Sequence, residues 1–213
     1  RKEAAQVYER ASFKLIEVQL SQAGDPAQTA QAALSFTDEF PASELADLAL
    51  NNAAAWLDEA GQRSGAMDAR RRLLASYPQS RFVPDALSAL AFGLESSADF
   101  VQSAELYERL GMQHSDHEDA AAALYSAAVF RRALGQPDAA RADLGALLEL
   151  GGGGHEPVLL RLEIARLHTD PALASNTYRL LLDGELTPDL RLVVAQEHFA
   201  LTGDRPLREE TLA

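Results

Sequence analysis

A 37-residue period runs through most of the chain and constrains its fold more than any other feature. Thr29, Ala66, Ser103 and Ala140 are spaced by 37 residues, and Ala174 continues the register 34 residues later. Self-similarity at a period of this length indicates stacked copies of one supersecondary unit, because a single unit cannot bury its apolar face alone. The chain is therefore predicted to contain about five units, with partial copies at both ends.

Each unit shows helical periodicity. Leu87, Leu90, Ala91 and Leu94 are apolar at the i, i+3, i+4 and i+7 spacing of one helix face. The sequence lacks the alternating runs rich in Val, Ile and Thr that predict strands. Its abundant alanine favours helix and lets neighbouring helices approach closely. We therefore predict an all-α fold with helices of about 12–18 residues.

Glycine and proline residues divide the units into helices. A helix commonly ends at a left-handed residue, which glycine adopts at no steric cost. Proline is tolerated in the first turn of a helix, where its missing N–H would have no partner. The predicted helix ends are Gly24, Gly61, Gly135 and Gly203, and the predicted first-turn prolines are Pro26, Pro137 and Pro171.

The period, the apolar spacing and the positions of glycine and proline together resemble the tetratricopeptide repeat. A small residue lies in the middle of the first helix at Ala54, Ala91 and Ala128, and Pro41 and Pro78 close two units. The pattern departs from the family because Leu50, Leu87 and Leu124 replace the aromatic residue near the start of the first helix. The resemblance implies a right-handed superhelical solenoid of antiparallel helix pairs, with residues 1–213 as one continuous domain. The chain begins at Arg1 without a signal-peptide pattern, so we expect it to be a fragment of a longer protein.

The junctions between units suggest a narrower resemblance. "FPAS" at residues 40–43 matches "YPQS" at residues 77–80, and the sequence pattern from Tyr77 to Ala86 is similar to that of one bacterial branch of the family. That branch includes the repeat lipoprotein of the outer-membrane barrel-assembly machine and the periplasmic coordinator of the Tol-Pal system. The resemblance implies a setting in the bacterial cell envelope or periplasm.

In the family that the chain resembles, the first helix of each pair lines a concave groove. The resemblance therefore implies a set of partner-binding positions in four units. They are Asn51, Asn52, Ser88, Phe92, Tyr125, Ser126, Val129, Glu163 and Arg166. A surface that mixes amide, hydroxyl, aromatic and charged groups suits recognition of a peptide or a helix.

Several of these positions also have a structural interpretation. Asn51 and Asn52 would hold the backbone of a ligand, or they are helix-surface residues that face water. Phe92 and Tyr125 are either binding anchors or residues that pack between repeats. Trp56, the only tryptophan, lies one residue outside the groove register and is predicted to belong to the core.

The charge balance restricts the class of partner. The chain carries 32 acidic and 19 basic residues, a net charge of −13, which argues against a nucleic-acid backbone as the main partner. Asp58, Glu59 and Glu95 lie near the predicted groove and favour a neutral or basic protein segment. No run approaches the length of a membrane span, so direct membrane insertion by this segment is not expected.

No combination of residues predicts catalysis or a cofactor. Cysteine is absent, and "LGGGGH" at residues 150–155 lacks the Lys-Ser/Thr of a phosphate loop. "HSDHED" at residues 114–119 could hold a metal, but the interpretation we favour is that Ser115 or Asp116 caps a helix starting near Glu118. Arg70, Arg71 and Arg72 point about 100° apart on a helix and do not form one basic patch. We predict no metal and no enzymatic activity.

The sequence thus predicts a non-enzymatic protein-interaction scaffold within a bacterial cell-envelope assembly. Two alternatives remain open. One is an intracellular repeat module of a regulatory or motility complex, and the other is a repeat domain attached to an enzyme outside this fragment.

Overall fold

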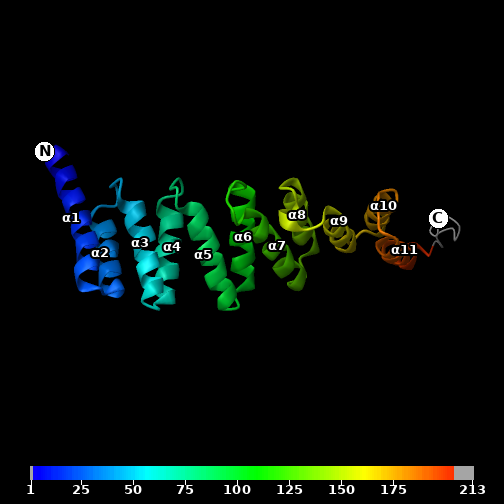
Figure 1. Cartoon of the computed structure of the whole chain (residues 1–213), viewed down its shortest axis with the longest axis horizontal. Helices are drawn as coiled ribbons and strands as arrows, with labels where there is room; N and C mark the ends of the chain where they lie inside the picture. Colours follow the sequence, from blue (N-terminus) through cyan, green and yellow to red (C-terminus); the bar gives the residue numbers. More distant parts are fainter. Residues whose placement is uncertain (1, 204–213) are drawn as a thin grey trace. The chain divides into compact units, whose positions relative to one another are not determined.

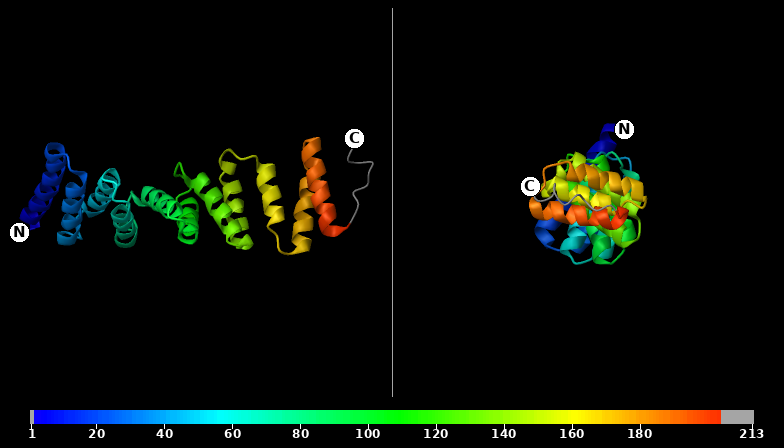
Figure 2. Two further views of the ribbon diagram at one scale, coloured as in Figure 1. Left: turned by 90° about the horizontal axis from the view of Figure 1, so that it is seen from below. Right: turned by 90° about the vertical axis from the view of Figure 1, so that its right-hand side faces the viewer.

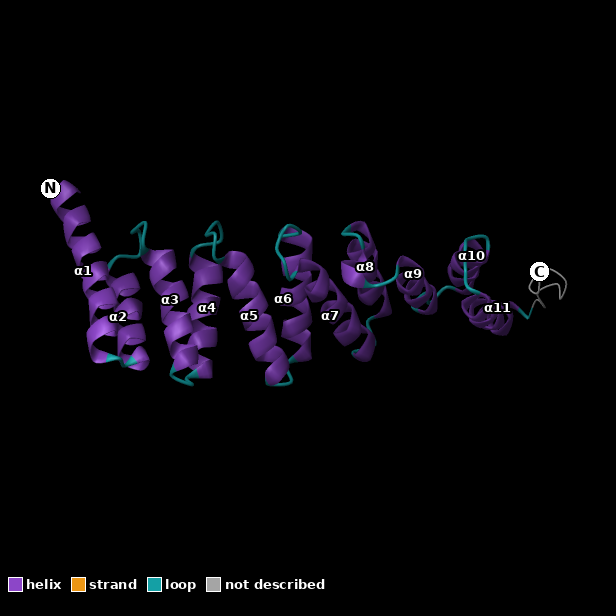
Figure 3. Ribbon diagram, viewed as in Figure 1, coloured by secondary structure: helices purple, strands orange, loops and turns teal. Residues whose placement is uncertain are grey.

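The computed structural model describes residues 2–203, with side chains for residues 6–18 and from residue 24 onward. These residues form eleven α-helices and one short 3₁₀ helix, and no strand occurs among them (Figure 3). The helices fall into two compact units, Arg1–Asp99 and Phe100–Ala213. The all-α prediction is confirmed, and the two units are described separately below.

The helices of each unit pack against their sequence neighbours (Figures 1 and 2). The first unit contains α1 (Lys2–Ala23), α2 (Pro26–Glu39), α3 (Ala46–Glu59), α4 (Arg63–Ser76) and α5 (Val83–Ser96). The second unit contains α6 (Phe100–Gln113), α7 (Ala120–Ala133), α8 (Pro137–Glu149), η1 (Gly152–Gly154), α9 (Pro157–Arg166), α10 (Pro171–Leu182) and α11 (Pro188–Thr202).

The helix starts reproduce the period of the sequence. The first helices α3, α5, α7 and α9 begin 37 residues apart, and the second helices α2, α4, α6 and α8 do so too. The period then shortens because α9 has only 10 residues, whereas α3, α5 and α7 have 14 each. The predicted length of 12–18 residues is wrong for α9 and for the 22-residue α1. The partial copy predicted after Gly203 lies outside the described residues.

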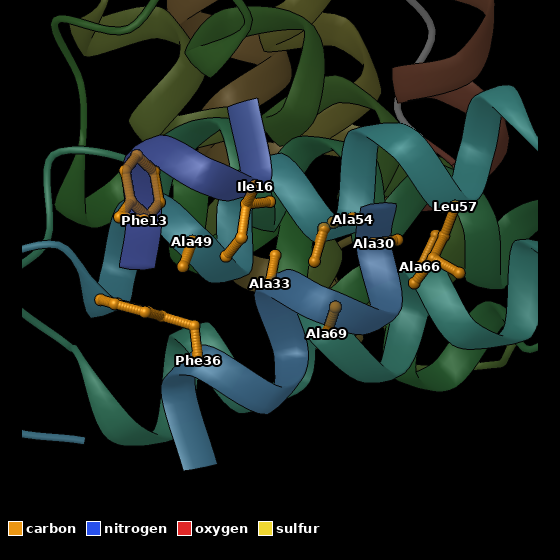
Figure 4. Close-up of a cluster of buried hydrophobic side chains, with 11 residues drawn as sticks. Phe13, Ile16, Ala30, Ala33, Phe36, Ala49, Ala54, Leu57, Ala66 and Ala69 are labelled. Carbon is orange, nitrogen blue, oxygen red and sulfur yellow. The ribbon is translucent and has the colours of Figure 1, made fainter. Parts of the chain in front are cut away.

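Buried alanines determine how closely the helices of the first unit approach. Ala30, Ala33, Ala49 and Ala53 are completely buried. Phe13 and Phe36 lie at one end of the same cluster and pack edge to face, with their ring centroids 5.5 Å apart (Figure 4). Small side chains at facing positions bring helix backbones together, which increases the number of van der Waals contacts. Trp56 packs against this cluster and is partly buried, so it lies at the edge of the core and not at its centre.

The residues repeated at the junctions, 40–43 and 77–80, have a structural role in the first unit. The Tyr77 hydroxyl donates a hydrogen bond of 2.8 Å to the Pro41 carbonyl of the preceding junction. The Ser80 hydroxyl donates to Asp47 Oδ2 at 2.6 Å and accepts from the Phe82 N–H at 3.2 Å. These bonds tie one junction to the next. The serine shared by "FPAS" and "YPQS" has the same role in both, because Ser43 Oγ also accepts a hydrogen bond from the Leu45 N–H, at 3.3 Å.

The glycine and proline predictions are confirmed. Gly24, Gly61, Gly135 and Gly203 all have positive φ angles, and α2, α8 and α10 begin at the predicted prolines. Ala98 lies 37 residues after Gly61 and 37 before Gly135, and it adopts the same left-handed conformation with φ of 61°. An L-residue with a Cβ atom pays a steric cost there that glycine does not.

No helix within residues 2–203 is long and apolar enough to span a bilayer.

We predict that Ala98→Gly stabilises the first unit by up to about 1 kcal/mol, because the steric cost at positive φ exceeds the extra chain entropy that glycine loses. Urea unfolding followed by circular dichroism measures the change. Ala60→Gly is the matched control, since Ala60 also ends a helix but has φ of −76°. That variant should be no more stable than the wild type, and equal gains at both positions would contradict the explanation.

Candidate partner-binding face

The nine predicted binding residues all lie on first helices. Four of them belong to the first unit and five to the second. Asn51 and Asn52 lie on α3, Ser88 and Phe92 on α5, Tyr125, Ser126 and Val129 on α7, and Glu163 and Arg166 on α9. Phe92, Tyr125 and Arg166 are exposed, and the other six are half-buried. We call the part of this set in each unit its first-helix face.

The two asparagines have unused hydrogen-bonding capacity. Neither Asn51 nor Asn52 makes a side-chain hydrogen bond to another described residue, although both side chains are half-buried. A primary amide offers two donors and a carbonyl acceptor. Polar groups in partly buried positions are satisfied by water or by a ligand. The two amides can therefore hold the backbone of an extended segment.

Phe92 is the most exposed large residue on this face, with 64% of its surface accessible. It borders a pocket of about 550 Å³ between α4 and α5. The pocket also involves Met67 and Arg63 of α4. Its size lies within the range of small-ligand sites, and most of its lining is apolar. Phe92 is therefore a candidate anchor and does not pack inside the first unit.

The charged residues on the first-helix face of the second unit, Glu163 and Arg166, bind each other and neighbouring charged residues. Arg132 Nη1 lies 2.8 Å from Glu163 Oε2, and Arg166 Nη1 lies 2.9 Å from Glu163 Oε1. Arg166 also makes two bonds to Glu197 of α11, at 2.6 and 3.0 Å. The Tyr178 hydroxyl donates to Glu197 Oε2 at 3.0 Å. We call this chain of contacts the charge ladder.

The charge ladder repeats along the sequence and is electrostatically well matched. Both inter-repeat pairs, Arg132–Glu163 and Arg166–Glu197, join residues 31 apart. The hydrogen bond from Arg166 holds the pKa of Glu197 below its usual range. Burial and the hydrogen bond to Glu197 raise the pKa of Tyr178 to about 12. Because Glu163 and Arg166 satisfy each other, a ligand would have to displace existing contacts to bind them.

Tyr125 has a partner that sequence reasoning missed. Its ring stacks on the imidazole of His155, with centroids 4.1 Å apart and planes 24° from parallel. His155 follows a run of four glycines, Gly151 to Gly154, which all have positive φ angles. This unusual backbone carries the chain from α8 to α9 and places His155 over α7. Tyr125 is thus partly covered within its own unit.

A buried charge cluster in the second unit was not predicted at all. Arg131 Nη1 of α7 lies 3.1 Å from both carboxylate oxygens of Asp143 of α8, and Arg131 Nη2 lies 2.5 Å from Glu108 of α6. Asp143 is completely buried. In the preceding copy of the repeat, 37 residues earlier, Leu94 and Leu106 occupy the positions of Arg131 and Asp143. The simultaneous change of two leucines to opposite charges is the signal that could have revealed the pair.

Burial dominates the protonation of this cluster. Loss of hydration raises the pKa of Asp143 to about 7, Arg131 opposes the shift, and Glu108 adds to it. The hydrogen bond that Arg131 donates to Glu108 raises the pKa of Arg131, which stays charged. A buried ion pair holds helices in one register, but its desolvation cost offsets much of its attraction. We therefore assign the cluster a structural role in joining α6, α7 and α8.

The histidine-rich junction is also explained by local structure. The helix that follows it begins at Ala120, with Asp119 at the cap position and no side-chain cap bond, so the prediction that Ser115 or Asp116 caps a helix near Glu118 is wrong. The Asp119 N–H instead donates to His117 Nδ1 at 3.2 Å. Residues 2–203 hold no group of three or more potential ligands gathered around one point.

The three consecutive arginines of α4 act separately, as predicted. Arg70 pairs with Asp58, Arg71 with Asp68 at 2.8 Å, and Arg72 with Asp38 at 2.6 Å. Two of the acceptors, Asp58 and Asp38, belong to the preceding helices α3 and α2. Arg70 and Arg72 therefore link helices of the first unit, and the three arginines do not form a basic binding surface.

Comparison with known proteins supports the fold. No protein-family model matches the sequence, and no curated protein matches it significantly. Among solved structures, a tetratricopeptide repeat protein from Parabacteroides merdae is 14% identical with a TM-score of 0.52, and the alignment covers 91% of this chain and 74% of that one. The structure of the MamA protein is 13% identical with a TM-score of 0.50, and the alignment covers 96% and 98%. Identities this low show the fold alone, an all-α helical-repeat solenoid of the tetratricopeptide type.

We predict that Arg131→Leu alone destabilises the second unit by about 3–5 kcal/mol, because it leaves a buried carboxylate without its partner. The double variant Arg131→Leu/Asp143→Leu restores the pair found as Leu94 and Leu106, and it should be as stable as the wild type or more stable by about 1–4 kcal/mol. Urea unfolding of both variants measures the changes. Equal destabilisation by the single and double variants would contradict a purely structural role.

The pKa of Asp143 also predicts a pH dependence of stability. A carboxyl whose pKa is higher in the folded chain than in the unfolded chain binds its proton more tightly when folded. Its contribution is therefore complete below about pH 4 and is lost as the pH rises through about 7. The free energy of unfolding of the wild type, minus that of Asp143→Asn, should decrease across this range. A difference that increases from pH 4 to pH 7 would show that Arg131 prevails over burial.

Proposed function

We propose that the chain is a non-enzymatic scaffold that binds a segment of a partner protein along its first-helix faces. The observation that carries the proposal is the contrast between the two units. In the first unit, Asn51 and Asn52 have unused amides and Phe92 is exposed beside a pocket. In the second unit, Glu163 and Arg166 are already paired. We therefore assign the main recognition surface to the first unit.

The free amides and the exposed ring suit a peptide better than a small metabolite. Asparagine side chains can hydrogen-bond the backbone of an extended segment whatever its sequence, and an apolar anchor then supplies affinity and selectivity. Tyr125, Ser126 and Val129 of the second unit are assigned to secondary contacts, because the Tyr125 ring already stacks on His155. Glu163 and Arg166 are assigned to support of the surface.

The net charge of −13 supports a neutral or basic partner and not a nucleic acid. Asp58 adds little negative charge for a partner, because it pairs with Arg70. Glu59 is exposed and makes no ion pair with any described residue. The setting that we propose, a bacterial cell-envelope assembly, rests on the resemblance of the junction letters at residues 77–86.

Selection of peptides from a random displayed library by the purified chain tests the function. We predict that Asn51→Ala/Asn52→Ala raises the dissociation constant of the selected peptides by about tenfold or more, because two amides that hold the peptide backbone are lost. Fluorescence anisotropy with a labelled peptide measures the affinity. The net charge of the selected sequences shows whether neutral or basic segments are preferred.

Asn176→Ala is the matched control, since Asn176 is an exposed asparagine on the second helix α10. It should leave the affinity unchanged. Peptides that bind the double variant and the wild type equally well would remove the asparagines from the site. A library that yields no binding peptide would contradict the proposed function itself.

A further inference from the structure

One position of the repeat changes from an aromatic residue to glycine and back. Trp56, Gly93 and Phe130 are spaced by 37 residues and lie at the same place in the first helices α3, α5 and α7. The second helices change in the opposite sense, because the matching residues of α2, α4 and α6 are Ala30, Met67 and Ala104. Two copies therefore combine a ring with an alanine, whereas the middle copy combines a glycine with a methionine.

The second unit shows what the ring does where it is present. Phe130 of α7 lies 5.1 Å from the ring of Phe100 and 6.3 Å from the ring of Tyr107, both on α6. In the copy with glycine, 37 residues earlier, Arg63 and Arg70 replace these two rings. The aromatic cluster between a second helix and the following first helix is thus absent between α4 and α5.

The α4–α5 pocket occupies the place of that missing cluster. Its lining includes Gly93, Met67, Phe92, Arg63 and Arg70. Met67 fills only part of the space: a Cβ atom added to Gly93 would lie 3.3 Å from the Cγ and Sδ atoms of Met67. A volume of about 550 Å³ remains, and Phe92 stays 64% exposed at its edge. The first unit therefore retains an apolar site built for a ring that its own sequence does not supply.

We propose that the α4–α5 pocket receives an aromatic side chain from the partner segment, in the place that Trp56 and Phe130 fill in the neighbouring copies. The chemistry of the lining favours an aromatic ring over an aliphatic one. Sulfur–aromatic contact with Met67 and ring–ring contact with Phe92 both stabilise it. This inference rests on the proposed function and names the side chain that the face selects.

The charges of the pocket complement an aromatic ring. Arg63 is exposed and pairs with no acidic group among the described residues, whereas Arg70 pairs with Asp58. A guanidinium attracts the electron-rich face of a ring, and this attraction strengthens when the pair is partly shielded from water. Arg63 can therefore cover the inserted ring without needing an acidic residue in the partner, which agrees with a neutral or basic segment.

The two methionines of residues 1–213 allow a direct test on the chain without any substitution. Met67 lines the pocket, whereas Met112 lies on α6 in the second unit and serves as an internal control. With ¹³C-methyl-labelled methionine, N-acetyl-tryptophanamide should shift the Met67 signal saturably through its ring current, with a dissociation constant on the order of 1 mM. N-acetyl-leucinamide should bind at least about tenfold more weakly, because it forms none of the ring contacts. Equal shifts at Met67 and Met112, or equal affinity for the two probes, would overturn the proposal.

A refilled variant tests the same idea with peptides. Gly93→Phe/Met67→Ala reproduces the Phe130–Ala104 combination of the second unit, so it should fold with the pocket closed. The peptides selected by the wild type should contain Trp, Phe or Tyr. We expect the refilled variant to bind these peptides about tenfold or more weakly than the wild type does. Met67→Ala alone enlarges the pocket and should keep the preference for an aromatic residue.

The outcomes separate this inference from the proposed function. Peptides that bind through Asn51 and Asn52, and that bind the refilled variant with unchanged affinity, would overturn the pocket and leave the scaffold intact. If the refilled variant does not fold, replacement of the aromatic residue by alanine in the selected peptide gives the answer. A loss of less than about twofold on that replacement would likewise overturn the pocket.

Discussion

Close packing between consecutive helices is the constraint on which the rest of this structure depends. A helix pair of this size cannot bury its apolar face by itself, so each helix needs its neighbour to complete a core. Fully buried alanines such as Ala33, Ala53 and Ala66 bring the backbones together. Leu50, Leu87 and Leu124 occupy the same register position of their first helices, and each is fully buried within its own unit. The same packing between neighbouring helices recurs within each unit, because side chains of the same kind recur every 37 residues.

The repeat is informative chiefly where it is broken. Glycine gives way to Ala98 at one helix end, leucines give way to Arg131 and Asp143 in one core layer, and an aromatic ring gives way to Gly93 between two helices. The neighbouring copies show what each position ordinarily does. The first break adds strain, the second replaces apolar packing by a buried ion pair, and the third leaves a space. Only the space is open to a partner, and this is why it carries the functional inference.

The two first-helix faces use polar groups in different ways. In the second unit the charge ladder links α7, α9 and α11 through ion pairs among Arg132, Glu163, Arg166 and Glu197. In the first unit the amides of Asn51 and Asn52 have no such partners. A face whose charges are internally matched is a poor electrostatic target, whereas amides that are free to bond a ligand, on a face that also has an apolar pocket, favour binding. Polar residues at one register position, Asn52 and Glu163, therefore serve recognition in the first unit, in our proposal, and support in the second.

The sequence by itself determined the all-α fold, the period and most helix ends, because these follow from local conformation and from apolar spacing. Gly24, Gly61 and Pro137 act within a few residues of their own position, so their effect could be predicted without knowledge of the fold. Only the tertiary structure decided which polar groups are free. Arg166 pairs with Glu197 31 residues away, and His155 stacks on Tyr125 after a glycine loop. The space beside Gly93 remains a pocket because Met67 of the neighbouring helix fills only part of it. These outcomes depend on side-chain geometry between helices, which the spacing of residues along the chain does not specify.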